Sequence, residues 1–439
     1  MSTWTSPSRR TVMASTAAAL AAGAVTACGS AKPGSGSDPG EPAKADFSER
    51  GPITLAKGKD TTGHLRSQVE AWNKEHPDEE VTFLELSESA DEQRVQLVNN
   101  ARSKSDAYTV LGMDVVWMAE FAANKWVVEL PKDRFPFDDM VPSTVTTATY
   151  FDRLYGVPWA SNAELLFYRK DLLEKAGADS APTSVEEMFE IAEAITGKEE
   201  SVFGFGSQFA KYEGLTVQIT GLIASAGGVL FDDEGTPHAD SPEAIRAMTE
   251  LRSAFDSGVI PKEALTYKEE ESRQAFQDGR LVFMQNWPYI WELVNKTDGS
   301  SKVTGKVGLV PLPGIDGKKG ASTLGGLNWS ISAFAGNHGT AADFISYLVK
   351  EESQKEFAMA TAQAPTLASL YEDKDLINRY AFWTALKEGI DAGVSRPPTV
   401  RYAEVTQAIQ ESAYRIISGE AEVEPEMKAL QKALVKLAP

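Results

Sequence analysis

The sequence contains very little cysteine and histidine, which excludes several kinds of site. Cys28 is the only cysteine among 439 residues, so neither an intrachain disulfide nor a cysteine-based zinc site can form. The four histidines, His64, His76, His238 and His338, lie far apart in the sequence. We therefore expect no metal site and no cofactor.

Long apolar runs and positive charge are also scarce. No strongly apolar stretch reaches 18 residues, which excludes a protein with several membrane-spanning helices. The 43 Lys and Arg residues stand against 63 Asp and Glu residues, giving a formal net charge of −20. Phosphate backbones repel so acidic a protein, so we expect no binding to nucleic acid. The length allows roughly two to three domains.

Motifs of most enzyme classes are missing. The chain has no G-x-S-x-G, no Walker A motif and no H-E-x-x-H, and Gly204-Phe-Gly206 lacks the third glycine of a dinucleotide loop. Paired carboxylates are all that a glycosidase needs. With Asp114 and the acidic run 269–271 as candidate carboxylates, the sequence therefore leaves a secreted glycoside hydrolase open as an alternative function.

Residues 1–28 have the pattern of an export signal, and residues 29–46 that of a tether. Arg9 and Arg10 precede the uncharged run 11–27, which is too short and too weakly apolar to span a membrane stably. Ser8 to Met13 resembles a twin-arginine signal, with Sec export as the alternative. Val25 to Gly29 resembles a bacterial lipobox, which implies that Cys28 is diacylated and anchors the protein to the membrane. The Gly-, Ser- and Pro-rich segment that follows predicts a flexible tether.

The body of the chain alternates strands and helices. Strands are predicted at 53–56, 81–86 and 107–113, and helices at 62–76, 91–103 and 115–125. Three such units in succession indicate a parallel sheet with helices on both faces. Further strands are expected at 155–159, 164–168, 280–285, 307–311 and 327–333, and further helices at 171–176, 185–196, 241–256, 270–277 and beyond 341. Thr183 and Glu186 form a capping-box signature, and Pro242 suits a first helical position.

Polar and aromatic residues gather at the ends of these elements. Ligands of open α/β sheets bind outside the carboxyl ends of the strands. A sugar needs polar side chains for its hydroxyls and an aromatic plate for its apolar face, and the residue types match these needs. The candidates are Asp60, Asp114, Asn162, Glu269, Glu270, Trp287, Tyr289, Gly326 and Arg396.

Several strings along the chain carry a resemblance to a known family. They are Leu111 to Ala122, Tyr155 to Asp171, Ala275 to Tyr289, Thr323 to Gly326, and Arg396 to Tyr402. In them the chain resembles a family 1 extracellular solute-binding lipoprotein of an ABC sugar importer, most of all the trehalose- and maltose-binding proteins. One departure is Leu327, where many relatives carry an aromatic residue; Trp329, two positions on, is expected to point to the same face of the strand.

The resemblance implies an α/β fold of two lobes, the type II periplasmic-binding-protein fold. Each lobe is expected to be a mostly parallel sheet flanked by helices, with the ligand in the cleft between them and closure about a hinge. The N-lobe is expected at 47–160 and 312–365, and the C-lobe at 161–311 and 366–439.

The resemblance also implies a function without catalysis. A monomer would capture a disaccharide of the trehalose or maltose type and deliver it to the ABC permease. Asp60, Asp114 and Asn162 would bind hydroxyls from the N-lobe and hinge side, and Glu269 or Glu270, Trp287 and Arg396 from the C-lobe. Gly326 would offer a backbone N–H. A surface sensor without a permease is a further alternative.

Overall fold

The computed structural model describes residues 41–178, 180–196, 198, 202–232, 235–397 and 399–437. The predicted export signal, Cys28 and most of the predicted tether lie outside these residues. Within the described part of the chain, no helix is long and apolar enough to cross a membrane.

A five-stranded sheet has the strand order β2-β1-β3-β11-β6. Its strands are β1 (Ile53–Gly58), β2 (Val81–Leu86), β3 (Val110–Asp114), β6 (Val157–Asn162) and β11 (Gly325–Ile331). β1 pairs in parallel with β2 and β3. β11 lies antiparallel between β3 and β6, with Leu327 opposite Asp114 and Gly325 opposite Asn162. The start of β11 therefore lies beside the ends of β3 and β6.

A four-stranded sheet has the order β10-β7-β9-β8. Its strands are β7 (Leu165–Arg169), β8 (Phe203–Gly206), β9 (Leu281–Asn286) and β10 (Val307–Val310). β7 is antiparallel to β9 and β10, and β8 is parallel to β9. A short hairpin joins β4 (Thr149–Tyr150) to β5 (Arg153–Leu154).

Each sheet contains one strand that runs against the others: β11 in the five-stranded sheet and β7 in the four-stranded sheet. The remaining strands of each sheet run in one direction, so the prediction of mostly parallel sheets is confirmed. The reason for the two exceptions lies in how the chain passes between the sheets. β6 ends where the chain leaves the first sheet, and β7 begins the second sheet directly afterwards. When the chain returns, β11 starts at the edge where β3 and β6 end, so it runs in the opposite direction to both.

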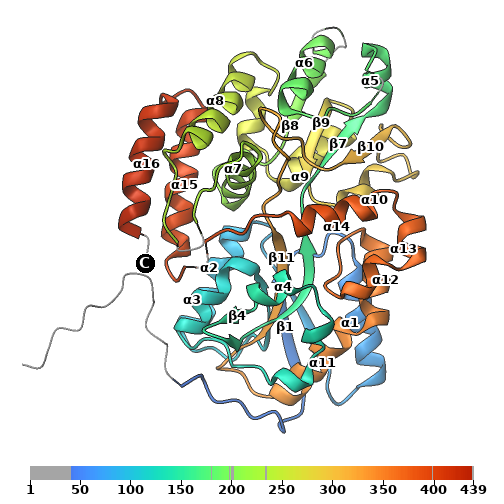
Figure 1. Cartoon of the computed structure of the whole chain (residues 1–439). Helices are drawn as coiled ribbons and strands as arrows, with labels where there is room; N and C mark the ends of the chain where they lie inside the picture. The colour runs from blue at the N-terminus through green and yellow to red at the C-terminus, as the bar shows by residue number, and fades with distance from the viewer. Residues whose placement is uncertain are drawn as a thin grey trace, which may run out of the picture. The chain divides into compact units, whose positions relative to one another are not determined.

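The helices pack around one sheet or the other (Figure 1). With the five-stranded sheet lie α1 (His64–Glu75), α2 (Ala90–Arg102), α3 (Met118–Ala123), α4 (Pro142–Thr147), α11 (His338–Val349), α12 (Glu351–Thr361), α13 (Lys374–Arg379) and α14 (Trp383–Asp391). With the four-stranded sheet lie α5 (Lys170–Ala176), α6 (Val185–Ile195), α7 (Glu213–Ser225), α8 (Pro242–Asp256), α9 (Glu269–Gln277), α10 (Ile290–Val294), α15 (Tyr402–Ile417) and α16 (Val423–Leu437). We call the first group with its sheet the N-lobe and the second the C-lobe.

The packing differs from the expected lobe boundaries in two segments. Trp383 and Ile390 are buried in the core of the five-stranded sheet, so 366–391 packs in the N-lobe and not in the C-lobe as expected. Ile315 is buried in the core of the four-stranded sheet, although 312–365 was expected in the N-lobe. Apolar helix faces indicate burial without indicating which core receives them.

Three segments connect the lobes, near residues 162–165, 321–325 and 392–397. Leu324 N–H donates to the carbonyl oxygen of Val394 at 2.8 Å, and Val394 N–H donates to that of Ser322 at 2.9 Å. The first segment joins them, because Glu164 N–H donates to Oγ of Ser322 at 2.7 Å. These bonds tie the three connections into one hinge.

Two predicted helix starts can be compared with the structure. Oγ of Ser241 accepts from Ala244 N–H and Pro242 takes the first position of α8, as predicted. For α6 the capping residue is Ser184, which accepts from Glu187 N–H, while Glu187 accepts from Thr183 N–H. The predicted pair Thr183 and Glu186 is thus displaced by one residue.

Candidate functional site

A cavity of about 280 Å³ lies where the two lobes face each other. Its lining comes from the ends of β1, β3 and β6 and the start of β11 in the N-lobe, and from the starts of α7 and α9 and the turn after β9 in the C-lobe. Eight predicted site residues line it: Asp114, Asn162, Glu269, Glu270, Trp287, Tyr289, Gly326 and Arg396. The structure therefore brings together residues that are far apart in the sequence.

Asp60 is the predicted residue that does not line the cavity, although Lys59 and Thr61 on either side of it do. Its carboxylate accepts from Gly63 N–H at 3.2 Å and from Arg66 N–H at 3.0 Å. These are the backbone donors at the start of α1, which need acceptors from outside the helix. Asp60 thus caps α1.

Asp114 and Arg396 form an ion pair on one wall of the cavity. Nη2 of Arg396 lies 2.8 Å from Asp114, and Nη1 lies 2.5 Å from Glu213. The Arg396 side chain is 1% exposed. Burial opposes its charge, but Asp114 and Glu213 hold the pKa of Arg396 well above its usual value. Nε of Arg396 is buried and makes no hydrogen bond to any described residue.

Glu213 was not predicted, because a single glutamate at the start of an otherwise uncharged helix carries no motif. Its carboxylate accepts from Arg396, from the hydroxyl of Tyr402 and, at 2.6 Å, from Oγ1 of Thr406. Burial raises the pKa of Glu213, while the charge of Arg396 opposes that rise. The wall is thus a hydrogen-bonded chain from β3 to α15.

The acidic run Glu269 to Glu271 opens α9, and all three residues line the cavity. Carboxylates are favoured at a helix N-terminus. Glu271 accepts from Lys268 N–H at 3.0 Å and so caps the helix. Burial raises the pKa of Glu269 to about 7.

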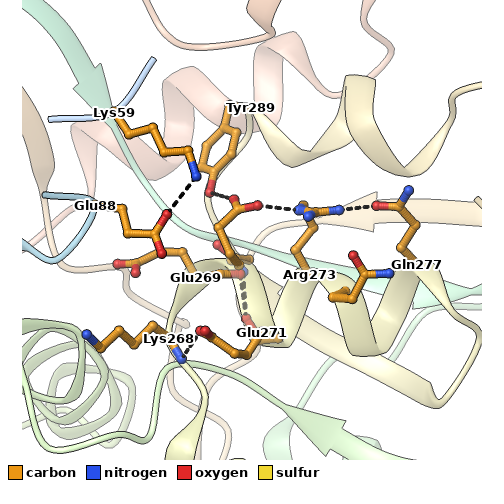
Figure 2. A network of polar contacts seen from close by, with 12 residues as sticks. Lys59, Glu88, Lys268, Glu269, Glu271, Arg273, Gln277 and Tyr289 are labelled. Carbon is orange, nitrogen blue, oxygen red and sulfur yellow. Dashed lines mark hydrogen bonds and ion pairs between the residues drawn. The ribbon is translucent and has the colours of Figure 1, made fainter. Parts of the chain in front are cut away.

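Figure 2 shows Tyr289, Arg273 and Gln277 within a chain of polar contacts. The Tyr289 hydroxyl donates to Glu270 at 2.8 Å, and Nε of Arg273 donates to it at the same distance. Arg273 also donates to Gln277. Opposite them, on the N-lobe side, Lys59 pairs with Glu88 at 3.0 Å. Tyr289 is therefore held by Glu270 with its ring at the cavity.

Trp287 supplies an aromatic surface. It follows β9, whose last residue, Asn286, donates through Nδ2 to the carbonyl oxygen of Glu269 at 3.1 Å and so ties the turn to α9. The indole lies against Gly325, where a Cβ atom would come within 2.6 Å of Cη2 of the ring. Glycine at this position makes room for the indole.

Trp329 does not compensate for Leu327 as expected. Trp329 is fully buried in the N-lobe core, with its ring centroid 4.9 Å from that of Trp159, whereas Leu327 lines the cavity. The pairing of β11 with β6 shifts register between Leu327 and Asn328, which breaks the simple alternation along the strand. Trp159, another residue that was not predicted, also lines the cavity.

Two further charged residues, Lys57 and Glu164, were not predicted from the sequence. Lys57 lines the cavity at the end of β1, where its burial lowers its pKa. Glu164 lies at the first connection and is 1% exposed. It accepts from Nε2 of Gln218 at 2.8 Å and from Nε2 of Gln285 at 2.9 Å, and burial raises its pKa to about 7. Among the described residues, no group of three or more His, Cys, Asp or Glu could hold a metal ion.

The lining therefore combines several carboxylates, a buried arginine and aromatic rings in one cavity. Such a set can satisfy the hydroxyls of a polar ligand while the rings cover its apolar face. Nothing in this geometry requires a bond to be broken.

The chain is similar in sequence to proteins that are already known. The profile of the bacterial extracellular solute-binding proteins matches residues 58–355. A probable ABC transporter-binding protein of Deinococcus radiodurans is 29% identical over 400 residues, covering 88% of this chain and 94% of the relative. The galactooligosaccharide-binding protein of Bacillus subtilis is 21% identical over 359 residues, covering 78% of this chain and 79% of the relative.

Among solved structures, maltose-bound MalE3 of T. maritima is 34% identical, with a TM-score of 0.84 over 88% of this chain and 99% of that protein. A solute-binding protein of Thermotoga lettingae shares the fold at a TM-score of 0.81 and 23% identity, covering 88% of this chain and 99% of that protein. These structures confirm the predicted two-lobed α/β fold. The predicted family is confirmed as well: the chain belongs to the bacterial extracellular solute-binding proteins.

Proposed function

We propose that the protein is the substrate-binding component of an ABC sugar importer, and that it captures a disaccharide of the maltose or trehalose type. The observation that carries this proposal is the cavity between the lobes, where Asp114, Arg396 and the acidic start of α9 lie with Trp287 and Tyr289. The likeness to a maltose-bound structure at 34% identity supports an α-glucoside as the ligand.

Capture without chemistry accounts for the arrangement. Asp114, Asn162, Glu269 and Glu270 offer acceptors to sugar hydroxyls, and Nε of Arg396 offers a buried donor. A buried polar group without a partner costs about 1–3 kcal/mol, so a sugar with hydroxyls in the wrong places is rejected. Closure about the three connections would bring the two halves of the lining together around the ligand.

The proposal extends to partners and location. The closed, loaded monomer would dock on an ABC permease. A diacylated Cys28 would hold the exported protein on the outer face of the membrane, with residues 29–46 as the tether and the twin-arginine route as its export path. Two alternatives would use the same lining. A glycoside hydrolase would cleave the sugar there, and a surface sensor would bind the sugar without passing it to a permease.

The test is a screen of mono- and disaccharides by thermal shift, followed by calorimetry. A ligand at 100 times its Kd adds about 2.7 kcal/mol to the free energy of unfolding. We expect maltose, trehalose or another α-glucoside to raise the Tm and to be recovered intact. A flat response to every sugar would refute the proposal, and turnover of the sugar would favour the hydrolase.

A comparison of the sugar affinities of Asp114→Ala and of its control, Asp60→Ala, tests whether the sugar binds in the cavity. Asp114→Ala should weaken sugar binding by about 1–3 kcal/mol, the contribution of one buried polar partner. Asp60→Ala removes the same charge from a residue that caps α1 and does not line the cavity, so the affinity should stay unchanged. Equal affinity in all three proteins would remove Asp114 from the site.

A further inference from the structure

The N-terminus of α7 is capped by a residue of the other lobe. The first N–H groups of a helix need acceptors from outside the helix. Tyr212, which precedes α7, makes no side-chain hydrogen bond to it. Instead, Glu213 N–H donates to Oδ2 of Asp91 at 3.1 Å. Asp91 belongs to the first turn of α2, which packs in the N-lobe, whereas α7 packs in the C-lobe core.

The two polar ends of Glu213 have different partners. Its carboxylate is bonded to Arg396 in the third connection and to Tyr402 and Thr406 of α15. Its N–H is bonded across the gap between the lobes to Asp91. A hinge motion that separates α2 from α7 breaks the second contact.

The contact lies next to the cavity without belonging to it. Glu213, Gly214 and Val217 of α7 line the cavity, and so do Ala90 and Gln93 of α2. Asp91 itself does not. The hydrogen bond therefore joins the two walls beside the cavity, and Asp91 is not part of the lining.

We propose that Asp91 is a positioning residue that stabilises the closed form by capping α7 across the lobes, and so strengthens ligand binding without touching the ligand. A carboxylate at a helix N-terminus gains from both the hydrogen bond and the helix dipole. Opening returns the N–H and the carboxylate separately to water. The inference rests on the proposed function only for the identity of the ligand.

The test compares Asp91→Ala with Glu92→Ala. Glu92 is the matched control: it lies in the same first turn of α2, carries the same charge and bonds to Ser87 within the N-lobe. With maltose as the probe, Asp91→Ala should raise the Kd about five- to tenfold, mainly through faster dissociation, since loss of a cap has effects of this order. Asp91→Asn keeps an acceptor oxygen and should lose less. Glu92→Ala should bind as the wild type does.

Amide hydrogen exchange without added ligand provides a second measurement that does not depend on the sugar. The Glu213 amide should exchange faster in Asp91→Ala than in the wild type or in Glu92→Ala, while amides within the core of α7 stay unchanged. If the wild type binds no sugar, the proposed function fails and the exchange result still decides whether Asp91 caps α7. Unchanged exchange at Glu213, or equal losses in both alanine variants, would overturn the inference.

Discussion

The indole of Trp287 lies against the backbone of Gly325, and any side chain at position 325 would displace it. The new Cβ atom would come within 2.6 Å of Cη2 and 2.8 Å of Cζ3 of the ring. We predict that Gly325→Ala weakens sugar binding by about 1–3 kcal/mol, the usual cost of forcing an extra carbon into a packed contact. Calorimetry with the sugar found in the screen measures the loss.

A double-mutant cycle with Trp287→Ala controls for other effects of the new methyl group. Once the indole is absent, the methyl group has room, so Gly325→Ala should cost little in that background. Additive losses would mean that Gly325 acts through something other than Trp287.

The raised pKa of Glu164 predicts that the free energy of unfolding depends on pH. Its pKa is raised by burial to about 7, against an ordinary value of 4.5. The folded state therefore holds the proton more tightly than the unfolded chain does. The resulting gain in stability is complete below pH 4.5 and is lost as the pH rises through 7.

Glu164→Gln removes the charge and keeps the shape. It should raise the free energy of unfolding by about 1–3 kcal/mol at pH 8 and leave it nearly unchanged at pH 4.5. Denaturant unfolding at the two pH values gives both differences. A loss of stability at pH 8 would show that the carboxylate is satisfied by Gln218 and Gln285 alone.

Whether a site residue could be predicted depended on whether its position in the sequence marks it as one. Acids and aromatics at strand ends, such as Asp114 and Trp287, could be picked out because the fold class brings strand ends together. Asp60 met the same criterion and was misassigned, because a local bond to the start of α1 looks the same in sequence. Glu164 and Glu213 are surrounded by apolar residues in the sequence, and only tertiary contacts show their partners.

At the scale of elements, β11 returns the chain to the N-lobe sheet. Gly326 is the residue of β11 at which an added side chain would collide with the neighbouring backbone. Gly326 has φ of 151°, and a Cβ atom there would lie 2.5 Å from the carbonyl oxygen of Ala160 on β6. We predict that Gly326→Ala lowers the free energy of unfolding by about 2–4 kcal/mol, since both the backbone and the strand pairing must give way. Denaturant titration measures it. Gly336→Ala, whose Cβ would have an ordinary contact at 3.5 Å, should change little.

Elements with a clear period were predictable, and those without one were not. The helices at 185–196 and 241–256 have one apolar face and were placed within a residue or two. Neither α7 nor β8 was predicted from the sequence. α7 is buried on nearly all sides, so its sequence has no polar face to mark a period. β8 has only four residues, two of them glycine.

At the scale of the whole molecule, the family strings indicated two lobes, but the routes between them needed the structure. The insertion of β11 between β3 and β6 depends on pairings between residues more than 150 positions apart in the chain. The assignment of α13 and α14 to the N-lobe depends on which core their apolar faces meet. Local sequence patterns carry neither kind of information.

The proposed location of the molecule rests on Cys28, which lies outside the described residues. We predict that Cys28→Ser moves the protein from the membrane fraction to the medium, because two acyl chains hold a protein stably where one is marginal. Fractionation of the native host followed by immunoblotting gives the answer. Replacing Arg9 and Arg10 by lysine serves as the companion variant: it should trap the precursor inside the cell if export uses the twin-arginine route, and leave export intact if it uses Sec. A Cys28→Ser protein that remains on the membrane would count against the lipid anchor.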